Sequence, residues 1–196
     1  MTADLSPKAE EIARHTTALL ASGGYNSFSY ADLAERVGIR KASIHHHFAS
    51  KATLVRVVVA QYRQQATAAL AQLSGHLGDP AAELQAYADH WVECIRTGDT
   101  PFCICGMLAT ELPTLPDEVA VEVRGHFRDL TDWVGSVLTR GAARGQFHFS
   151  GTPKSAAQSF VSVVYGAMLL ARALGDPAVF QSTVQSAIQA LLAPPR

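Results

Sequence analysis

The chain has 196 residues, of which 48% are hydrophobic and only 8% aromatic, and its formal net charge is −1. This length and composition suit one or two compact domains, and they exclude a fibre and a disordered tail. Taken alone, so small a net charge argues against a nucleic-acid-binding protein.

The charge is spread unevenly along the chain. The stretch from residue 36 to residue 78 holds six basic residues and no acidic one, so it carries +6 and the remainder carries −7. These basic residues are Arg36, Arg40, Lys41, Lys51, Arg56 and Arg63. Phosphate binding depends on the field at the contact face, so such a stretch is expected of a local polyanion site. Chance segregation of charge on a solvated surface is the alternative.

The cysteines and apolar runs bear on the compartment. Cys94, Cys103 and Cys105 cannot form a fully paired set, and the chain does not open on a secretory signal pattern. We therefore expect a cytoplasmic protein with reduced thiols. The apolar run over 160–174 is interrupted and shorter than the ~20 residues that span a bilayer, so no membrane association is expected.

Apolar residues recur at helical spacing through most of the chain, and no convincing alternating strand appears. Glycines and prolines mark the expected helix ends. The expected helices cover about 6–22, 30–37, 41–48, 50–74, 80–97, 105–112, 117–144, 153–174 and 177 to just before 194. The sequence therefore predicts an all-α fold of about nine helices, whose first three form a unit of their own.

The segment over residues 29–44 has the pattern of a helix-turn-helix. Ser29 followed by Asp32 predicts a capping box at the start of the first helix. Ala34 is small enough for close helix approach, and Gly38 tolerates the left-handed conformation that the turn needs. Apolar residues join the two helices, namely Leu33, Val37, Ile39 and Ile44.

The second helix of this pair is too polar to be a core helix. Its polar residues leave only Ile44 and Phe48 to bury. Such a helix is typical of one whose outer face enters the major groove. A plain helical hairpin is the alternative, but it gives no reason for a polar, acid-free helix. The consecutive histidines 45–47 point about 100° apart and cannot converge on one ion, so no metal site is predicted there.

These residues resemble the TetR/AcrR family of transcriptional repressors. The matching run extends from Phe28 to Phe48 and continues from Ser50 to Leu54, and the close similarity covers about residues 9–58. One departure is His45, where the family usually has tyrosine. A histidine still donates to a phosphate or a base, so the departure concerns the operator sequence rather than DNA binding.

The resemblance implies a set of DNA contacts. It implies base-edge contacts from Lys41, Ala42, Ser43 and His45, and phosphate contacts from Tyr30, Arg40, His47 and Lys51. Lys51 fits this role independently, because Ser50 is a good N-cap and the first turn of the next helix offers free amides to a phosphate.

The resemblance also implies a division of the chain and a partner. Residues 1–50 are expected to form the DNA-binding domain, and residues 51–196 the effector-binding and dimerisation domain, linked by the long helix that begins near residue 50. The last two helices carry more apolar surface than a terminal pair usually buries on one side. In the family they form a four-helix dimer interface, so a homodimer is expected; ordinary intramolecular core is the alternative.

The middle helices are expected to hold a pocket for a small-molecule effector. Its candidate lining residues are mostly apolar, as such pockets tend to be. They are Trp91, Cys94, Phe102, Met107, His126, Phe127, Trp133 and Tyr165. For each of them, ordinary core packing is the alternative.

The cysteines over residues 102–109 are a second candidate for sensing. The segment resembles a Gly-Cys-Leu-x-Gly passage in one branch of these regulators, some of which sense electrophiles or oxidants through cysteine. Cys103 matches that cysteine, Cys105 is additional, and Phe102 replaces the glycine. A thiol just before a helix N-terminus favours its thiolate. The alternatives are plain buried cysteines, or a soft-metal site with Cys94 and His90.

Three classes of function are candidates for this sequence. The leading one is a homodimeric repressor that binds a palindromic double-stranded operator and is released by a small-molecule or electrophile effector. An architectural DNA-binding protein without effector control is the alternative. An enzyme is not expected, since no nucleophile and base constellation, phosphate loop or His-Glu metal spacing appears, and no cofactor is predicted.

Overall fold

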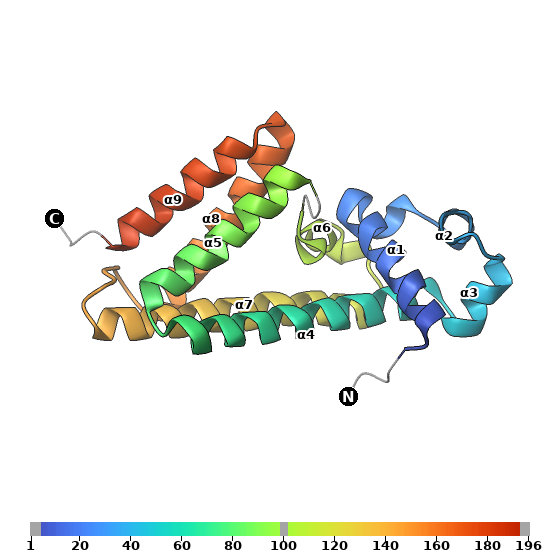
Figure 1. The fold of residues 1–196 in the computed structure, drawn as a ribbon, viewed down its shortest axis with the longest axis horizontal. Helices are drawn as coiled ribbons and strands as arrows, with labels where there is room; N and C mark the ends of the chain where they lie inside the picture. Colours follow the sequence, from blue (N-terminus) through green and yellow to red (C-terminus); the bar gives the residue numbers. More distant parts are fainter. Residues whose placement is uncertain (1–4, 99–101, 193–196) are drawn as a thin grey trace. The chain divides into compact units, whose positions relative to one another are not determined.

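The computed structural model describes residues 5–98 and 102–192 of the chain. Within these ranges it contains nine α-helices, two short 3-10 helices and no strand (Figure 1). The helices are α1 (Pro7–Gly23), α2 (Tyr30–Val37), α3 (Lys41–His47), α4 (Lys51–Leu77), α5 (Pro80–Thr97), α6 (Ile104–Thr110), α7 (Asp117–Ala143), α8 (Pro153–Leu174) and α9 (Pro177–Leu192), with η1 (Tyr25–Ser27) and η2 (Leu112–Thr114). The all-α prediction is confirmed.

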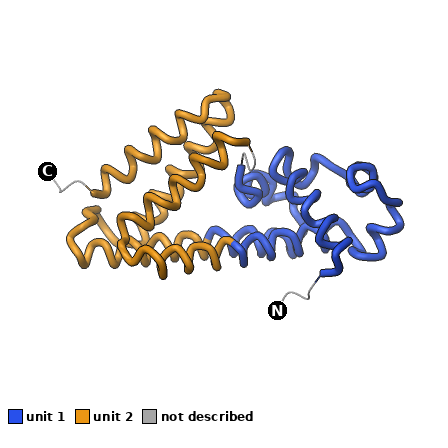
Figure 2. The backbone as a smooth tube through the Cα atoms, viewed as in Figure 1, with its two compact units in different colours: residues 1–65, 102–127 blue, residues 66–101, 128–196 orange. Residues whose placement is uncertain are grey.

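The chain divides into two compact units (Figure 2). Unit 1 consists of residues 1–65 and 102–127, and unit 2 of residues 66–101 and 128–196. The helices α4 and α7 therefore contribute residues to both units. The functional boundary expected near residue 50 falls inside unit 1 and stays a prediction.

Unit 1 is built around the first three helices and α6. The apolar stripe of α1 includes Ile12 and Leu20, which are fully buried. Leu33 of α2, Ile44 of α3 and Leu54 of α4 are also fully buried. Helix α1 packs against both α2 and α6. Helix α6, which begins at the two neighbouring cysteines, thus packs on the first helix of the DNA-binding domain expected from the sequence.

Unit 2 is a bundle in which α9 packs against α5 and α8. Helix α8 begins with a capping box between Thr152 and Ser155 and ends at Gly175, which adopts the left-handed conformation. Seven of its residues are buried, including Phe160 and Met168. Among the described helices only α8 is long and apolar enough to cross a membrane, a test that core helices also pass, and its buried residues pack within unit 2.

Candidate nucleic-acid interface

The first helix of the helix-turn-helix begins as the sequence predicted. The Ser29 hydroxyl accepts hydrogen bonds from the amides of Ala31 and Asp32, and the Asp32 carboxylate accepts one from the Ser29 amide at 2.6 Å. Both halves of the capping box are present, so that prediction is confirmed. The Ser29 hydroxyl donates to the Asp32 carboxylate at 2.8 Å, and this bond together with that from the Ser29 amide holds the pKa of the Asp32 carboxyl below its usual value.

The turn between α2 and α3 depends on Gly38. Its φ of 72° and ψ of 33° lie in the left-handed region that side chains disfavour. The Gly38 amide donates to the carbonyls of Ala34 and Glu35, and the Ile39 amide donates to Ala34 at 3.0 Å. This tight closure sets the direction in which α3 leaves the turn.

Helix α3 buries one side chain and exposes the rest of its reading face. Ile44 is fully buried, and His47 is half-buried. The four residues expected to reach base edges are all exposed, namely Lys41, Ala42, Ser43 and His45. Arg40, just before the helix, is exposed as well. An exposed, acid-free helix held by a single apolar anchor has the geometry that major-groove reading requires.

Tyr30 and His45 lie together at one edge of this face. Their rings meet edge-on with centroids 4.9 Å apart. Tyr30 is buried, its hydroxyl donates to the Phe48 carbonyl at 3.1 Å, and burial raises its pKa to about 12. Its phosphate contact, implied by the resemblance, stays a prediction. In this structure its hydroxyl ties α2 to the end of α3.

Lys51 occupies the first turn of α4, where the Thr53 amide donates to the Ser50 hydroxyl at 3.0 Å. The Lys51 ammonium donates to the Phe28 carbonyl and lies 4.5 Å from the Tyr25 ring centroid and 4.2 Å from that of Phe28. Burial lowers its pKa from the usual lysine value. The loop before α2 therefore holds the Lys51 ammonium in place, and its phosphate contact, implied by the resemblance, stays a prediction.

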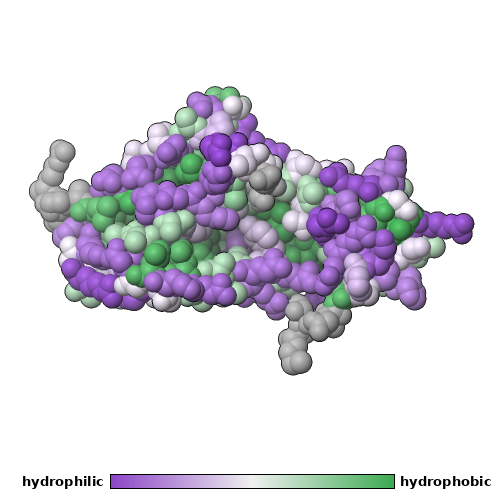
Figure 3. Space-filling model, in the orientation of Figure 1, coloured by the Kyte–Doolittle hydropathy of each residue, from purple (hydrophilic) through white to green (hydrophobic). Residues whose placement is uncertain are grey.

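A shallow depression joins these features on the surface of unit 1. It is lined by residues from the α2 cap, from α3 and from the start of α4: Phe28, Ser29, Tyr30, Lys41, His45, Ala49, Ser50 and Lys51. Four of these are among the eight DNA contacts expected from the sequence. Hydrophilic side chains predominate on the visible surface around α2 and α3 (Figure 3). With lysine, histidine and hydroxyl groups in its lining, the depression lies at the edge of α3 and suits a phosphate group.

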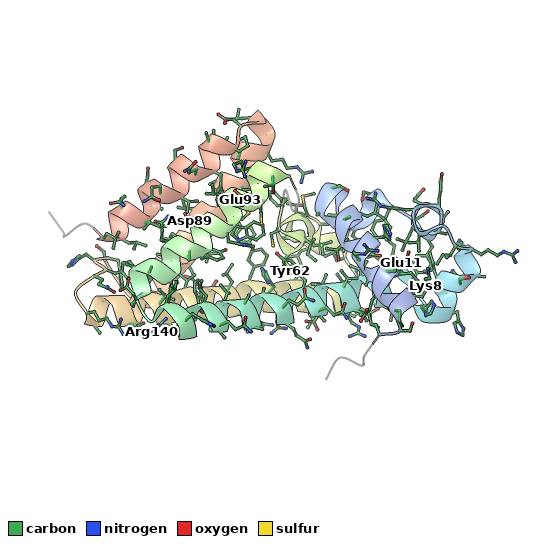
Figure 4. All side chains as sticks on the ribbon, in the orientation of Figure 1. Lys8, Glu11, Tyr62, Asp89, Glu93 and Arg140 are labelled. Atoms are coloured by element: carbon green, nitrogen blue, oxygen red, sulfur yellow. The ribbon has the colours of Figure 1, made fainter. Side chains whose placement is uncertain are left out.

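The candidate sensing residues of unit 1 form one buried group. Cys103 is the N-cap of α6 and Cys105 lies in its first turn, both fully buried, and His126 of α7 is 6% exposed. The Cys103 sulfur is 3.8 Å from His126 Nε2. Tyr62 extends from α4 towards α6 (Figure 4), and its hydroxyl donates to Cys103 at 3.2 Å. Burial raises the pKa of the Cys105 thiol well above its usual value.

Four of the remaining candidates belong to unit 2, whereas Phe102, Met107 and Phe127 belong to unit 1. Trp91 is buried in α5, and Tyr165 of α8 is half-buried. Trp133 of α7 donates through Nε1 to the Ser74 hydroxyl at 3.0 Å. The Cys94 sulfur lies 3.7 Å from His90 Nε2, one turn back on α5. These contacts are those of packed side chains, and an effector-binding role for them stays a prediction.

One residue absent from the sequence-based expectation stands out in unit 1. The Glu111 carboxylate, at the end of α6, accepts hydrogen bonds from the Tyr25 amide at 2.5 Å and from the Asn26 amide at 3.1 Å. It also accepts one from the Asn26 side chain at 2.9 Å. Nothing in the local sequence signals this contact, because the partners lie 85 and 86 positions away. It connects the cysteine-bearing helix to the segment that supports Lys51.

A capped helix-turn-helix with an exposed basic reading helix, carried by an all-α body, defines a DNA-binding regulator. The family model "Bacterial regulatory proteins, tetR family" matches residues 12–58, and "Tetracyclin repressor-like, C-terminal domain" matches residues 80–187. The chain belongs to the TetR family of transcriptional regulators, which are not enzymes.

Solved structures agree. A TetR-family regulator from Agrobacterium tumefaciens is 48% identical, with 95% of this chain and 98% of that chain covered and a TM-score of 0.93. A TetR regulator from Legionella pneumophila is 26% identical, with 96% and 99% covered and a TM-score of 0.85. The reduced form of NemR from E. coli shares the fold at 17% identity, with 96% and 100% covered and a TM-score of 0.83. No curated protein matches the chain.

Proposed function

We propose that this TetR-family protein is a cytoplasmic homodimeric repressor that reads a palindromic operator through α3 and releases it when an effector binds. The observation that carries the DNA-reading part is the exposure of all four base-reading candidates around the single buried anchor Ile44. A dimer follows from the reach of α3, since one such helix covers only a few base pairs and two related copies read two half-sites.

The surface of α8 and α9 supports the dimer. Leu169, Leu170 and Leu174 of α8 are 57%, 49% and 63% exposed in the single chain, which is unusual for side chains of this size. Among the other exposed positions of α8, Ser159 and Gly166 are small. A groove between the helices adds apolar lining from Phe160, Val163, Ala187, Ala190 and Leu191. Small residues beside exposed leucines suit close packing against the same helices of a second copy.

A physical connection within unit 1 supports effector control. Helix α6 begins at the buried cysteines and ends at Glu111, whose carboxylate holds the Tyr25 and Asn26 amides. The Tyr25 ring in turn lies against the Lys51 ammonium. A shift of α6 would therefore move the loop that precedes the helix-turn-helix. An effector that binds better to the shifted form than to the DNA-bound form would then release the DNA.

The test of the proposal is a binding selection from random duplex DNA, repeated with a panel of small molecules and oxidants. We expect enrichment of a two-fold palindrome whose half-sites lie about 10 base pairs apart, or a multiple of that spacing, and at least one compound that releases it. An architectural protein would enrich no palindrome and would respond to no compound. That result would contradict the repressor proposal.

Lys51→Ala is expected to weaken binding to every duplex alike. Removing one phosphate contact lowers the slope of log affinity against log salt by about 0.9. The measurement is an anisotropy titration over a salt series, on operator and on random duplex. Lys154→Ala, which removes a lysine from the first turn of α8, is the matched control and leaves the slope unchanged. An unaltered slope for Lys51→Ala would remove Lys51 from the phosphate contacts.

Glu111→Gln is expected to loosen the connection between α6 and the DNA-binding segment. One carboxylate oxygen becomes an amide NH₂ group that faces the Tyr25 or Asn26 donors. The free energy of unfolding is therefore expected to fall by about 1–3 kcal/mol. We also expect operator affinity to fall by about 5-fold or more. Urea unfolding and operator titration measure the two effects. Glu10→Gln, at an exposed position of α1, is the control, and equal behaviour of the two variants would show that Glu111 has no such role.

A further inference from the structure

Cys103, Cys105 and His126 form a buried group of three side chains that metal ions commonly use as ligands. The two sulfur atoms and one imidazole nitrogen all lie within 4.8 Å of one another, and the three side chains are buried. Two of them come from the first turn of α6 and its cap, and the third from α7, so two helices hold the group in place. This set shares its two cysteines with the soft-metal combination expected from the sequence, and within the described part of the chain His126 supplies the third ligand atom.

The distances suit a small thiophilic cation. Metal bonds of about 2.3 Å to sulfur and about 2.0–2.1 Å to nitrogen place tetrahedral or trigonal ligand atoms roughly 3.5–4 Å apart. The Cys103 sulfur and His126 Nε2 are already 3.8 Å apart. Only a small movement is needed to bring the Cys105 sulfur to the same separation. Sulfur and imidazole ligands without a carboxylate favour Zn²⁺ or Cu⁺ over hard cations such as Mg²⁺ or Ca²⁺.

Charge balance favours a divalent ion among these. Two thiolates and one neutral imidazole carry −2, so Zn²⁺ gives a neutral group, which a buried position tolerates best. Arg63 adds no net charge nearby, because it pairs with Glu122 at 3.2 Å. The Tyr62 hydroxyl, 3.2 Å from the Cys103 sulfur, provides the kind of outer hydrogen bond that orients a ligand.

We propose that Cys103, Cys105 and His126 bind one Zn²⁺ ion per chain, with a water as fourth ligand. The two cysteines enter as thiols and release their two protons to solvent when the ion binds. Binding draws the first turn of α6 towards α7. Glu111 follows the last residue of α6 and accepts hydrogen bonds from the Tyr25 and Asn26 amides. The ion therefore shifts the loop that precedes the helix-turn-helix. This last step, in which Zn²⁺ changes operator affinity, rests on the proposed function; the binding of the ion does not.

The site is tested on the full reduced protein with Co²⁺ as a spectroscopic probe and Zn²⁺ as competitor. We expect thiolate-to-cobalt charge-transfer absorption that saturates at one ion per chain and is displaced by Zn²⁺. Cys105→Ala and His126→Asn are expected to weaken Zn²⁺ binding by about 10-fold to 100-fold or more. Cys94→Ala, which removes the third cysteine, is the matched control and keeps full binding.

Two further readouts keep the test decisive. Zn²⁺ is expected to raise the Tm of the wild type and of Cys94→Ala but not of the two site variants, whose helicity by circular dichroism shows whether they fold. Absence of cobalt absorption in the wild type, or its loss in Cys94→Ala, would overturn the site. Operator titration with and without Zn²⁺ then tests regulation separately: unchanged affinity would overturn the regulatory step, while loss of operator binding under all conditions would count against the proposed function.

Discussion

Gly166→Glu is expected to turn the protein into a monomer without harming its fold. A Cβ at Gly166 meets no other atom within 4 Å, and this position is exposed on α8. Replacing a helical glycine gains up to about 1 kcal/mol of helix propensity, so the single chain becomes as stable or more stable. A charged side chain between two close-packed helices would instead block the second copy.

The consequence for DNA is large, because two linked half-sites bind about 100-fold to 10,000-fold more tightly than one. We therefore expect light scattering to report a monomer and operator affinity to fall by about 100-fold or more. Gly75→Glu on α4 makes the same change at another helical position where a Cβ has open space, and it is expected to remain dimeric and bind normally. A dimeric Gly166→Glu protein would place the interface elsewhere.

Arg140→Ala is expected to destabilise unit 2 strongly. The Glu83 side chain is 0% exposed, and its two oxygens accept hydrogen bonds from Arg140 at 2.9 and 2.7 Å. It also accepts from the Ser74 hydroxyl, which itself accepts from the Trp133 indole. Removing the arginine leaves a buried carboxylate without its countercharge. Because Arg140 is one-third exposed and water reaches it, the expected cost is at the low end for such pairs, about 3 kcal/mol.

Chemical unfolding measures this loss of stability. Two further variants serve as controls for it. Arg96→Ala breaks an exposed pair with Glu93 and is expected to cost far less, because solvent screens such a pair. Combining Arg140→Ala with Glu83→Leu removes the stranded charge and should recover much of the lost stability. Equal costs for Arg140→Ala and Arg96→Ala would mean that Glu83 is effectively solvated.

The same pair predicts a pH dependence. The Arg140 hydrogen bonds hold the pKa of the Glu83 carboxyl below its usual value of 4.5. A carboxyl whose pKa is lower in the folded state stabilises the fold above the unfolded pKa, and this contribution is lost as the pH falls through the folded pKa. The wild type and Arg140→Ala are therefore expected to differ most in free energy of unfolding at neutral pH. This difference should become smaller as the pH falls below the usual pKa of a glutamate, as chemical unfolding over a pH series would show.

The amino-acid sequence alone determined the features that rest on local geometry. The Ser29 and Asp32 capping box, the left-handed turn at Gly38 and the polar reading helix each depend on residues a few positions apart. Helix periodicity likewise predicted all nine helices, although the expected sixth helix over 105–112 is divided into α6, which ends at Thr110, and the short η2. Pro113 accounts for the break, because its ring cannot continue an α-helix.

Only the tertiary structure decided which distant side chains meet. Glu111 reaches amides 85 and 86 positions away, Arg140 reaches a carboxylate 57 positions away, and His126 joins the cysteines across two helices. Such contacts leave no period or spacing in the sequence, because they depend on how separate helices pack rather than on the winding of one. The sequence could therefore predict the helix-turn-helix, whereas the contact from Glu111 to the segment before it and the proposed metal-ligand group became visible only once the helices were assembled.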